Sequence, residues 1–447
     1  MTTSLTAGEL ARKVVHMAVG LIAFAVRPLG PVLAALCALA ALLFNLFILP
    51  RIGGRKLWRR AESERGMSVG IVLYPLTVLL LILAFHRHLE VAAGVWGILA
   101  FGDGMASVVG MAIGRHRLPW NPRKSWGGSL AYALFGTAAC ATLVQWTAPG
   151  VYPLGYALAV SAAAAVFAAA LESQPQGLDD NLGVPLLAGL WLFLLLAAHG
   201  GWANLATPEV TGRLAAAVGI NLALAIAGFA ARSVNVSGMI GGFLIGTLIY
   251  ACLGWQGYLL LLAFFVLGTG ATKLGYRRKA EAGLAQEGGG RRGASHALAN
   301  TGVAAACALF AVVTPFSPIL VLAFAAAFAT AAADTASSEI GQLWGRRTFL
   351  ITTLRPVPRG TEGAVSLEGT LAGIAASAVV AGLGVAVGLF GLAGALVVVV
   401  AAFVGTTLES LAGATLENRG LLDNEAMNFL NTLVGALVAA ALHALIS

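Results

Sequence analysis

One polar motif occurs twice in a chain that is otherwise strongly apolar. Residues 102–115 read GDGMASVVGMAIGR and residues 333–346 read ADTASSEIGQLWGR, so that Asp103 aligns with Asp334. Each Asp lies in a stretch that is apolar enough to cross a membrane. Burying a carboxylate at that depth is costly, and such residues usually serve a function. The repeated motif therefore predicts two copies of one functional site.

The residues after Asp103 combine a helix face, a basic loop and further carboxylates. Free amides and the dipole at a helix N-terminus attract phosphate, and carboxylate oxygens are ligands that Mg²⁺ prefers. The first half therefore predicts a magnesium-nucleotide site, in which Asp103, Glu172 and Asp180 bind the metal and Lys124 is a catalytic cation. The other predicted binding residues are Ser107, Gly110, Gly114, Arg115, Arg123, Ser125, Gly127, Gly128 and Ser129. The alternative is a purely structural ion pair of Asp103 with Arg115 or Lys124.

The second half repeats this series with one change of charge. Asp334, Glu409 and Asp423 are its predicted metal ligands, and Glu339 is a further catalytic carboxylate. The predicted binding residues are Ser338, Gly341, Gly345, Arg346, Arg355, Arg359, Thr361, Gly363, Ser366, Asn428 and Asn431. No Lys matches Lys124, and arginines, which bind phosphate in a bidentate manner, replace it. The change fits a different acceptor, or one that is already phosphorylated.

Three polar residues near the N-terminus, Glu9, Lys13 and His16, have the spacing of one helix face. One interpretation is an ion pair at the membrane interface with a capping His. The other is that these side chains position an acceptor, with His16 as a catalytic general base beside its hydroxyl. The residues alone leave both interpretations open.

The composition predicts the fold class. Of the 447 residues, 59% are hydrophobic and 10% are charged, and apolar runs recur along the whole length. This is typical of an all-α, polytopic transmembrane protein, for which we expect about fifteen spans. Matching motifs in the same order predict two parallel, homologous helical-bundle repeats joined by an extra linker span. The expected domains are residues 1–200 and 236–447, with the outer loop and linker span at 201–235.

The basic residues predict the orientation in the membrane. Segments 51–65, 115–124, 273–292 and 346–359 contain 20 of the 27 Lys and Arg residues. Short basic loops lie on the cytoplasmic side. We therefore expect the N-terminus and both sites at the cytoplasmic face of an inner membrane. Topology and a polyphosphate partner account for the net charge of +8, so no nucleic-acid partner is expected.

Several motifs resemble those of known families. The stretch GDGMASVVGMAIGRHRLPWNPRKSWGGSLA resembles the proposed CTP-binding segment of dolichol and phytol kinases, and the segment from Glu9 to His16 resembles their N-terminal motif. The second half resembles the membrane family that includes phytyl-phosphate kinases. The motifs that carry this second resemblance are RGASHALANTGVAA, ADTASSEIG, RGTEGAVSLEGTLAG and the Asn-rich segment 418–431.

The resemblance implies a natural fusion of two sequential kinases. The first half would convert a prenyl alcohol (phytol, geranylgeraniol, farnesol or a longer prenol) to its monophosphate, and the second half would form the diphosphate. Mg-CTP would be the phosphoryl donor, with ATP as the alternative. The chain departs from the family pattern at Gly127, where an acidic residue is common. Two other functions are open: a CTP-dependent lipid-phosphate cytidylyltransferase, and a transporter of a lipid phosphate or anion.

Overall fold

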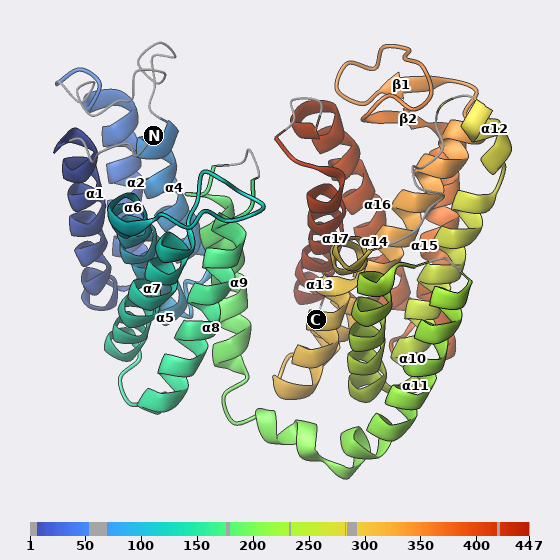
Figure 1. Cartoon of the computed structure of the whole chain (residues 1–447), viewed down its shortest axis with the longest axis horizontal. Coiled ribbons are helices and arrows are strands. Elements are labelled where there is room, and N and C mark those ends of the chain that lie inside the picture. The colour runs from blue at the N-terminus through green and yellow to red at the C-terminus, as the bar shows by residue number, and fades with distance from the viewer. Residues whose placement is uncertain are drawn as a thin grey trace. The chain divides into compact units, whose positions relative to one another are not determined.

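The computed structural model describes residues 7–52, 69–175, 179–231, 234–281, 283, 293–417 and 421–446. These residues are mostly helical (Figure 1). Contacts within the chain divide it into two compact units, Met1–His199 and Gly200–Ser447. Residues 53–65 of the first predicted basic loop, residues 282 and 284–292 of the loop 273–292, and Asn418 lie outside the described residues.

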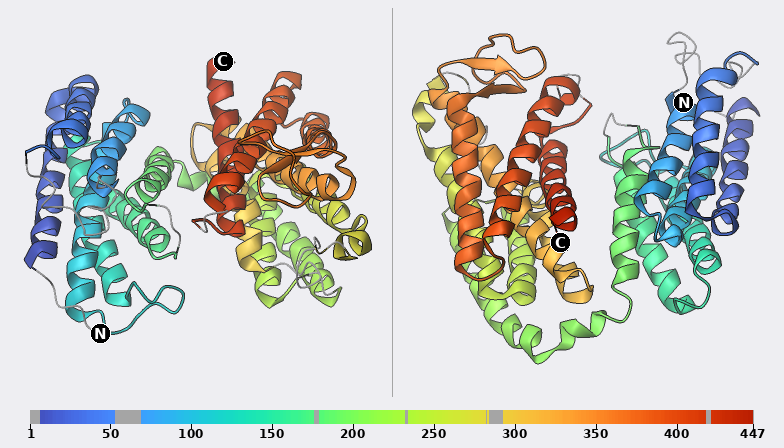
Figure 2. Two further views of the ribbon diagram at one scale, coloured as in Figure 1. Left: turned by 90° about the horizontal axis from the view of Figure 1, so that it is seen from above. Right: turned by 180° about the vertical axis from the view of Figure 1, so that it is seen from behind.

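The first unit is a helical bundle in which α7 is central. Its elements are α1 (Ala7–Gly20), η1 (Leu21–Ala25), α2 (Val26–Leu43), η2 (Phe44–Ile48), α4 (Val69–Ala84), α5 (Leu89–Gly97), η4 (Ile98–Gly102), α6 (Asp103–Ile113), α7 (Trp126–Thr147), α8 (Leu154–Glu172) and α9 (Gly183–Ala197). Helix α7 packs against α5, η4, α6 and α8, so the helices that carry the predicted site residues are direct neighbours (Figures 1 and 2).

The second unit is built around α14. Its elements are η5 (Trp202–Ala206), α10 (Pro208–Ala230), α11 (Val236–Lys273), α12 (Tyr276–Glu281), α13 (Ala294–Val313), α14 (Ser317–Trp344), β1 (Thr348–Leu350), β2 (Ala364–Ser366), α15 (Leu367–Ala386), α16 (Leu392–Ala412), η7 (Gly413–Glu417) and α17 (Asn424–Ile446). Helix α14 contacts α11, α13, α15, α16 and α17. Its buried run from Ala325 to Ala333 is mostly Ala, which lets the neighbouring backbones approach closely.

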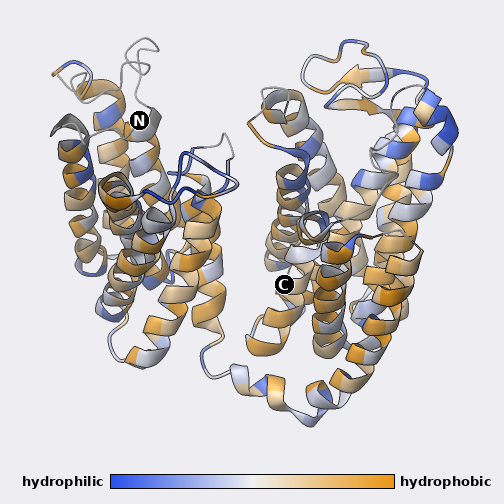
Figure 3. Ribbon diagram, in the orientation of Figure 1, coloured by the Kyte–Doolittle hydropathy of each residue, from blue (hydrophilic) through white to orange (hydrophobic). Residues whose placement is uncertain are grey.

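The composition of the helices confirms a multi-pass integral membrane protein. Within the described ranges, 11 helices are long and apolar enough to cross a membrane. Apolar residues cover the helix bodies, whereas hydrophilic residues gather at loops and helix ends (Figure 3). On α10, Leu222, Leu224 and Ile226 are exposed, as expected for a surface that faces lipid. Helix α10 contains the span that was predicted as a linker. It packs on α11 and is part of the second unit.

Two long helical segments contain a sharp bend at a glycine. Gly30 in α2 has φ 68° and Gly254 in α11 has φ 66°, and in each case two helices meet at the bend. Two further apolar helices, Gly70–Ala84 and Gly183–Ala197, are shorter than the 11. The number of 15 spans and the parallel arrangement of the repeats stay predictions.

The second unit contains one small sheet that the sequence did not predict. Strands β1 and β2 pair in antiparallel register, with Thr348 opposite Ser366 and Leu350 opposite Ala364. The segment between Arg346 and Ser366 is long enough to fold back on itself, whereas the matching segment from Arg115 to Ser125 forms one bridge, between Arg117 and Ser125. Strands this short, in a polar loop, contain too few apolar residues for a sequence pattern to predict them.

The bend at Gly254 generates a stability prediction. With φ 66° and ψ −165°, this residue occupies backbone space that only glycine visits readily. A Cβ there would also lie 2.8 Å from Gln256 Oε1. We expect Gly254→Ala to destabilise the protein by about 1–3 kcal/mol, measured as a lower Tm in detergent.

Gly382→Ala is the matched control in the interior of α15. No described atom lies within 4 Å of a Cβ added there, and the backbone is helical. Ala should therefore leave Tm unchanged or raise it slightly. If Gly254→Ala melts like the wild-type protein, the chain does not bend at Gly254.

Candidate functional site

In the first unit, Asp103 begins α6 directly after the π-helical turn η4, a type of distortion that is common at functional sites. The carboxylate faces α1, where Lys13 Nζ lies 2.7 Å from Asp103 Oδ2. His16 Nε2 lies 3.6 Å from the same oxygen. The Asp103 side chain keeps 24% of its surface exposed. The structure thus joins Asp103 to the N-terminal helix, and not to Arg115 or Lys124 as the structural alternative held.

The His16 ring is held in a defined orientation. Its Nε2 lies 3.0 Å from the carbonyl oxygen of Leu99, which can only accept a hydrogen bond. The proton of a neutral ring therefore sits on Nε2, and Nδ1 is left as a proton acceptor. The ring packs edge-on against Tyr74, whose hydroxyl accepts a hydrogen bond of 2.8 Å from Trp96 Nε1.

Lys124 forms the second charged cluster of the first unit. Its ammonium pairs with Glu172 at the end of α8 and lies 3.4 Å from Asp180 Oδ2. Burial disfavours the charged form of Lys124, but attraction to Glu172, Asp180 and Asp103 outweighs burial and raises the pKa of Lys124. Burial also raises the pKa of Asp180, and Lys124 offsets part of that rise. One lysine thus links two of the predicted carboxylates and lies within electrostatic range of the third.

The loop that carries Lys124 is fastened to the end of α8. Asn121 Nδ2 donates to the carbonyl oxygens of Ser173, at 3.1 Å, and Gln174, at 3.3 Å. Trp120 Nε1 donates to Ser173 Oγ at 3.2 Å. Arg115 and Arg123 are exposed and remain at the surface of the loop. The loop therefore offers exposed guanidinium groups beside a half-buried ammonium.

A close crossing of α6 and α7 supports this loop. Buried Ser125 caps α7 by accepting a hydrogen bond of 3.2 Å from the Gly128 amide. A Cβ on Gly110 would lie 3.3 Å from Ser125 Oγ, so a side chain there would require the capping serine to shift by a few tenths of an ångström. Ser129 Oγ, by contrast, is buried without a hydrogen-bond partner among the described residues. Of the other residues predicted here, Ser107 lies in the middle of α6, Gly114 directly follows α6, and Gly127 lies in the first turn of α7.

The second unit repeats this local arrangement. Ser366 has the same extended backbone as Ser125 and caps α15 by accepting from the Gly369 amide at 3.1 Å. A Cβ on Gly341 would lie 3.2 Å from Ser366 Oγ. By this register, Val365 stands at the position of Lys124 and Glu368 at that of Gly127. The acidic residue missing from the first copy is therefore present in the second.

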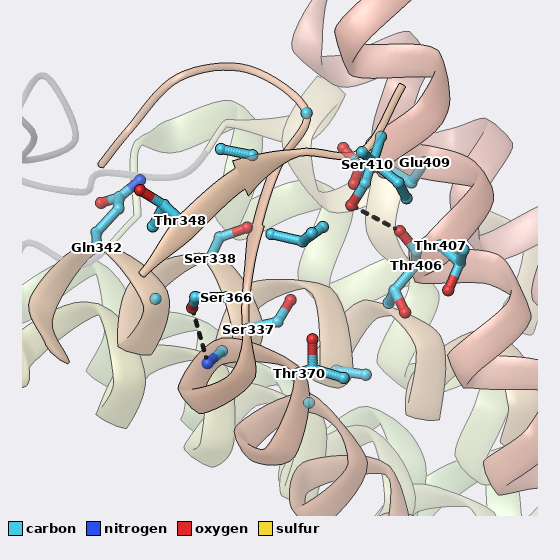
Figure 4. A pocket seen from close by; sticks show the side chains of 18 of the residues that line it. Ser337, Ser338, Gln342, Thr348, Ser366, Thr370, Thr406, Thr407, Glu409 and Ser410 are labelled. Carbon is cyan, nitrogen blue, oxygen red and sulfur yellow. Dashed lines mark hydrogen bonds between the residues drawn. The ribbon is translucent and has the colours of Figure 1, made fainter. Parts of the chain in front are cut away.

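A polar cavity opens between α14, α15, α16 and the β1–β2 segment of the second unit (Figure 4). Hydroxyl and carboxylate groups dominate its walls, with Glu409 and its neighbours on α16 facing α14 and α15. Of the predicted residues, those that line it are Ser338, Gly341, Thr361, Gly363, Ser366 and Glu409. The other hydroxyl residues of the lining, which the sequence did not assign to the site, are Ser337, Thr348, Thr370, Ser377, Thr406, Thr407 and Ser410. Single Ser and Thr residues in apolar helices give no signal that distinguishes a cavity wall from ordinary packing.

The remaining predicted residues of the second unit lie outside this lining. Arg346 and Arg355 are exposed, and Arg359 donates to the Leu343 carbonyl oxygen at 3.3 Å. Asp423 Oδ1 accepts from the Ala426 amide at 2.8 Å and so caps α17. Asn428 donates to Asn424 Oδ1 at 2.9 Å, buried Asn431 lies beside Gly405, and Gly345 packs against Ser366.

Glu339 and Asp334 take different positions along α14. Glu339 is buried and pairs with Lys279 of α12, and it does not line the cavity. Asp334 is half-buried one turn before Ser337 and Ser338, which do line it. The partner of Glu339 could not be foreseen, because Lys279 is one of several basic residues in the same loop.

The carboxylates form no preassembled metal centre. In the described part of the chain, no three His, Cys, Asp or Glu side chains are grouped closely enough to hold a metal ion. Mg²⁺ in nucleotide sites is often held by one or two carboxylates together with phosphate oxygens, so hard oxygen donors such as Glu172 and Asp180 fit an ion that arrives with its nucleotide. The predicted metal roles stay predictions.

Comparison with known proteins identifies the family. A family model described as integral membrane protein DUF92 matches residues 219–436. Protein sll0875 of Synechocystis sp., an uncharacterized membrane protein, is 46% identical over 205 residues, which are 45% of this chain and 80% of the relative. No solved structure matches.

Two plant proteins are similar over shorter fractions of their own length. Protein VTE6, chloroplastic, of Arabidopsis thaliana is 39% identical over 46% of this chain and 64% of the relative. Probable phytol kinase 2, chloroplastic, of Oryza sativa is 32% identical over 41% of this chain and 64% of the relative. The chain thus spans less than two thirds of either plant protein. With its multi-pass helical architecture, it belongs to the DUF92 family of integral membrane proteins, among whose homologues are proteins named VTE6 and phytol kinase.

Proposed function

We propose that the protein is a membrane-embedded isoprenoid kinase. The observation that carries the proposal is the meeting of Asp103, Lys13 and His16 on one side and Lys124, Glu172 and Asp180 on the other, in one small helical unit. The name of the rice relative, probable phytol kinase 2, supports a prenyl alcohol as the acceptor. Helices that face lipid would let such a substrate enter from the bilayer.

The two clusters of the first unit suit the two reactants of a phosphoryl transfer, which are the nucleotide donor and the acceptor hydroxyl. Lys124 and the exposed Arg115 and Arg123 supply cations for the phosphates of a nucleotide, for which we propose CTP. Asp103 is engaged by Lys13 and His16, which favours a role at the acceptor hydroxyl over one as a metal ligand. Glu172 and Asp180 would hold Mg²⁺, which neutralises phosphate charge when it is bound.

In the proposed step, the prenyl hydroxyl oxygen forms a bond to the γ-phosphorus, and the bond from that phosphorus to the β–γ bridging oxygen breaks. The bridging electron pair leaves with the nucleoside diphosphate, and the hydroxyl proton passes to the Asp103 carboxylate. Lys13 then remains beside a neutral carboxyl group, which releases its proton after the products leave.

We further propose that the second unit phosphorylates the prenyl monophosphate. The repeated Ser cap and glycine crossing around Ser366 and Gly341 support a second site of the same type. In the second unit, the cavity that Glu409 lines would bind the reactants, as the Lys124 cluster would in the first unit. The exposed arginines at 346, 355 and 359 would meet the charged acceptor or the triphosphate at the cavity rim.

Asp103→Asn tests the first step. Incubation of the purified full-length protein with Mg-CTP and geranylgeraniol or phytol should yield CDP and the prenyl monophosphate. Loss of the proton acceptor should lower kcat for this step by about 10²–10⁴. The affinity for Mg-CTP should stay within about threefold, because Asp103 is not assigned to the metal. A large loss of Mg-CTP affinity would instead make Asp103 a metal ligand.

Glu90→Gln is the matched control for Asp103→Asn. Glu90 lies in the first turn of α5, pairs with His88 at 3.2 Å and belongs to the same membrane span as Asp103. Removing this carboxylate should leave turnover unchanged. Release of pyrophosphate by the wild-type protein would indicate a cytidylyltransferase, and absence of any nucleotide turnover would refute the kinase.

Asp334→Asn and Glu409→Gln test the division of labour between the units. Each should reduce formation of the diphosphate by about 10²-fold or more and leave formation of the monophosphate intact, because the residues belong to the second unit. Glu209→Gln, which removes the exposed partner of Arg213 in α10, is the control. If either site variant also blocks the alcohol step, the two sites are not independent.

The charge of Lys124 generates a pH prediction. Because its pKa is raised above the ordinary value of 10.5, Lys124 stays protonated across the usual assay range and cannot cause an alkaline loss of activity below about pH 10. The pH profiles of the wild-type protein and Lys124→Arg should therefore have the same alkaline limb, measured as kcat/KM for the alcohol step. An alkaline limb that disappears only in Lys124→Arg would show that Lys124 titrates there.

A further inference from the structure

The second unit contains a buried ion pair that the proposed reaction does not use. Lys279 of α12 pairs with Glu339 of α14, and their side chains are only 2% and 8% exposed. Lys and Glu are almost never buried to this degree unless they are paired. The pair joins two segments that are 60 residues apart in the sequence.

Lys279 also caps the end of α11. Its ammonium donates to the carbonyl oxygens of Thr272, at 2.9 Å, and Ala271, at 3.3 Å, in addition to Glu339. Carbonyl groups in the last turn of a helix have no partner within the helix. An ammonium has three donors, so all three are used here. Lys279 thus fastens the end of α11 to the side of α14.

The same stretch of α14 forms one wall of the polar cavity. Ser337, Ser338 and Gly341 line the cavity, whereas Glu339 between them does not. A second contact holds the same region, since a Cβ on Gly275, at the α11–α12 turn, would lie 2.6 Å from Leu343 Cδ2. The contacts of α11 and α12 with α14 therefore fix how α14 is rotated about its axis and where it lies along that axis. They thereby position the cavity wall that α14 forms.

We propose that Lys279 and Glu339 are a positioning pair for the second site, and that Glu339 is not a catalytic residue. The proposal rests on the proposed kinase function of that site. The pair holds the face of α14 that presents Ser337 and Ser338 to the ligand. Removing one partner leaves a buried charge without compensation, whereas replacing both by apolar side chains of similar length removes the charge altogether.

The test compares Lys279→Met, Glu339→Met and the double variant in the full-length protein. Each single variant should lower kcat/KM for prenyl monophosphate by about tenfold or more, and part of the loss should be a higher KM, because the cavity wall moves. The double variant should be at least about fivefold better than either single variant, since the two changes are coupled. Lys279→Arg, which keeps the charge and the donors, should retain most of the activity.

Two further measurements separate positioning from other roles. Hydrogen exchange over residues 334–342 should accelerate in the single variants and recover in the double variant, and this readout does not require turnover. Phosphorylation of the alcohol by the first unit should not change, and it serves as the internal control.

Three outcomes would overturn the proposal. In the first, the double variant recovers its Tm and exchange protection but stays as inactive as Glu339→Met, which would make Glu339 catalytic. In the second, the single variants have unchanged exchange over 334–342. In the third, their active fraction falls at constant KM, which indicates stability alone. A wild-type protein without any turnover would instead refute the kinase function, while the exchange measurement still decides whether the pair holds α14.

Discussion

The cost of burying charge in an apolar helical protein organises both units. An isolated ionised carboxylate among these helices would be strongly unfavourable, so each one needs a cation within reach. Lys13 neutralises Asp103, Lys124 neutralises Glu172, and Lys279 neutralises Glu339. The partners are 90, 48 and 60 residues apart, so each pair ties together helices that are distant in sequence. Apolar helix faces are nearly interchangeable in lipid, and such pairs specify which helices meet.

The two units share a scaffold and differ in the charges placed on it. In both, a Ser caps the helix that follows the motif, and glycines on the preceding helix make room for that cap. At the positions of Lys124 and Gly127 in the first unit, the second unit has Val365 and Glu368. The second unit thus carries less positive and more negative charge beside its cap. The two units thus combine one local geometry with different charges.

Much of this organisation could be predicted from the sequence, because it rests on local patterns. Apolar runs identified the helices, and the repeated motif located Asp103 and Asp334 within them. The spacing of Lys13 and His16 identified the helix face that meets Asp103. Ser125 and Ser366 are predicted as ligand-binding residues, and in the structure their hydroxyls also cap their own helices.

The features that could not be predicted share one physical cause, which is contact between distant segments. The position of Glu339 depends on Lys279, and nothing local distinguishes that lysine from its basic neighbours. The strands β1 and β2 are three residues long and lie in a polar loop, where no periodicity develops. The hydroxyl-lined cavity needs α14, α15 and α16 to be side by side before Thr406 and Ser338 can share it.

The charge pairs also constrain how the proposed substrate can bind. Lys124 is already paired with Glu172 and Asp180, so a nucleotide phosphate must displace carboxylates that lie in a partly buried setting. Displacement by a free triphosphate would leave Glu172 buried without a cation, which is the arrangement that costs most. A nucleotide that arrives as its magnesium complex avoids this cost. Lys124 would then exchange a carboxylate for a phosphate, while Glu172 and Asp180 would gain a new counter-charge. The ion pair that stabilises the free protein would thereby select the metal complex of the nucleotide over the free nucleotide.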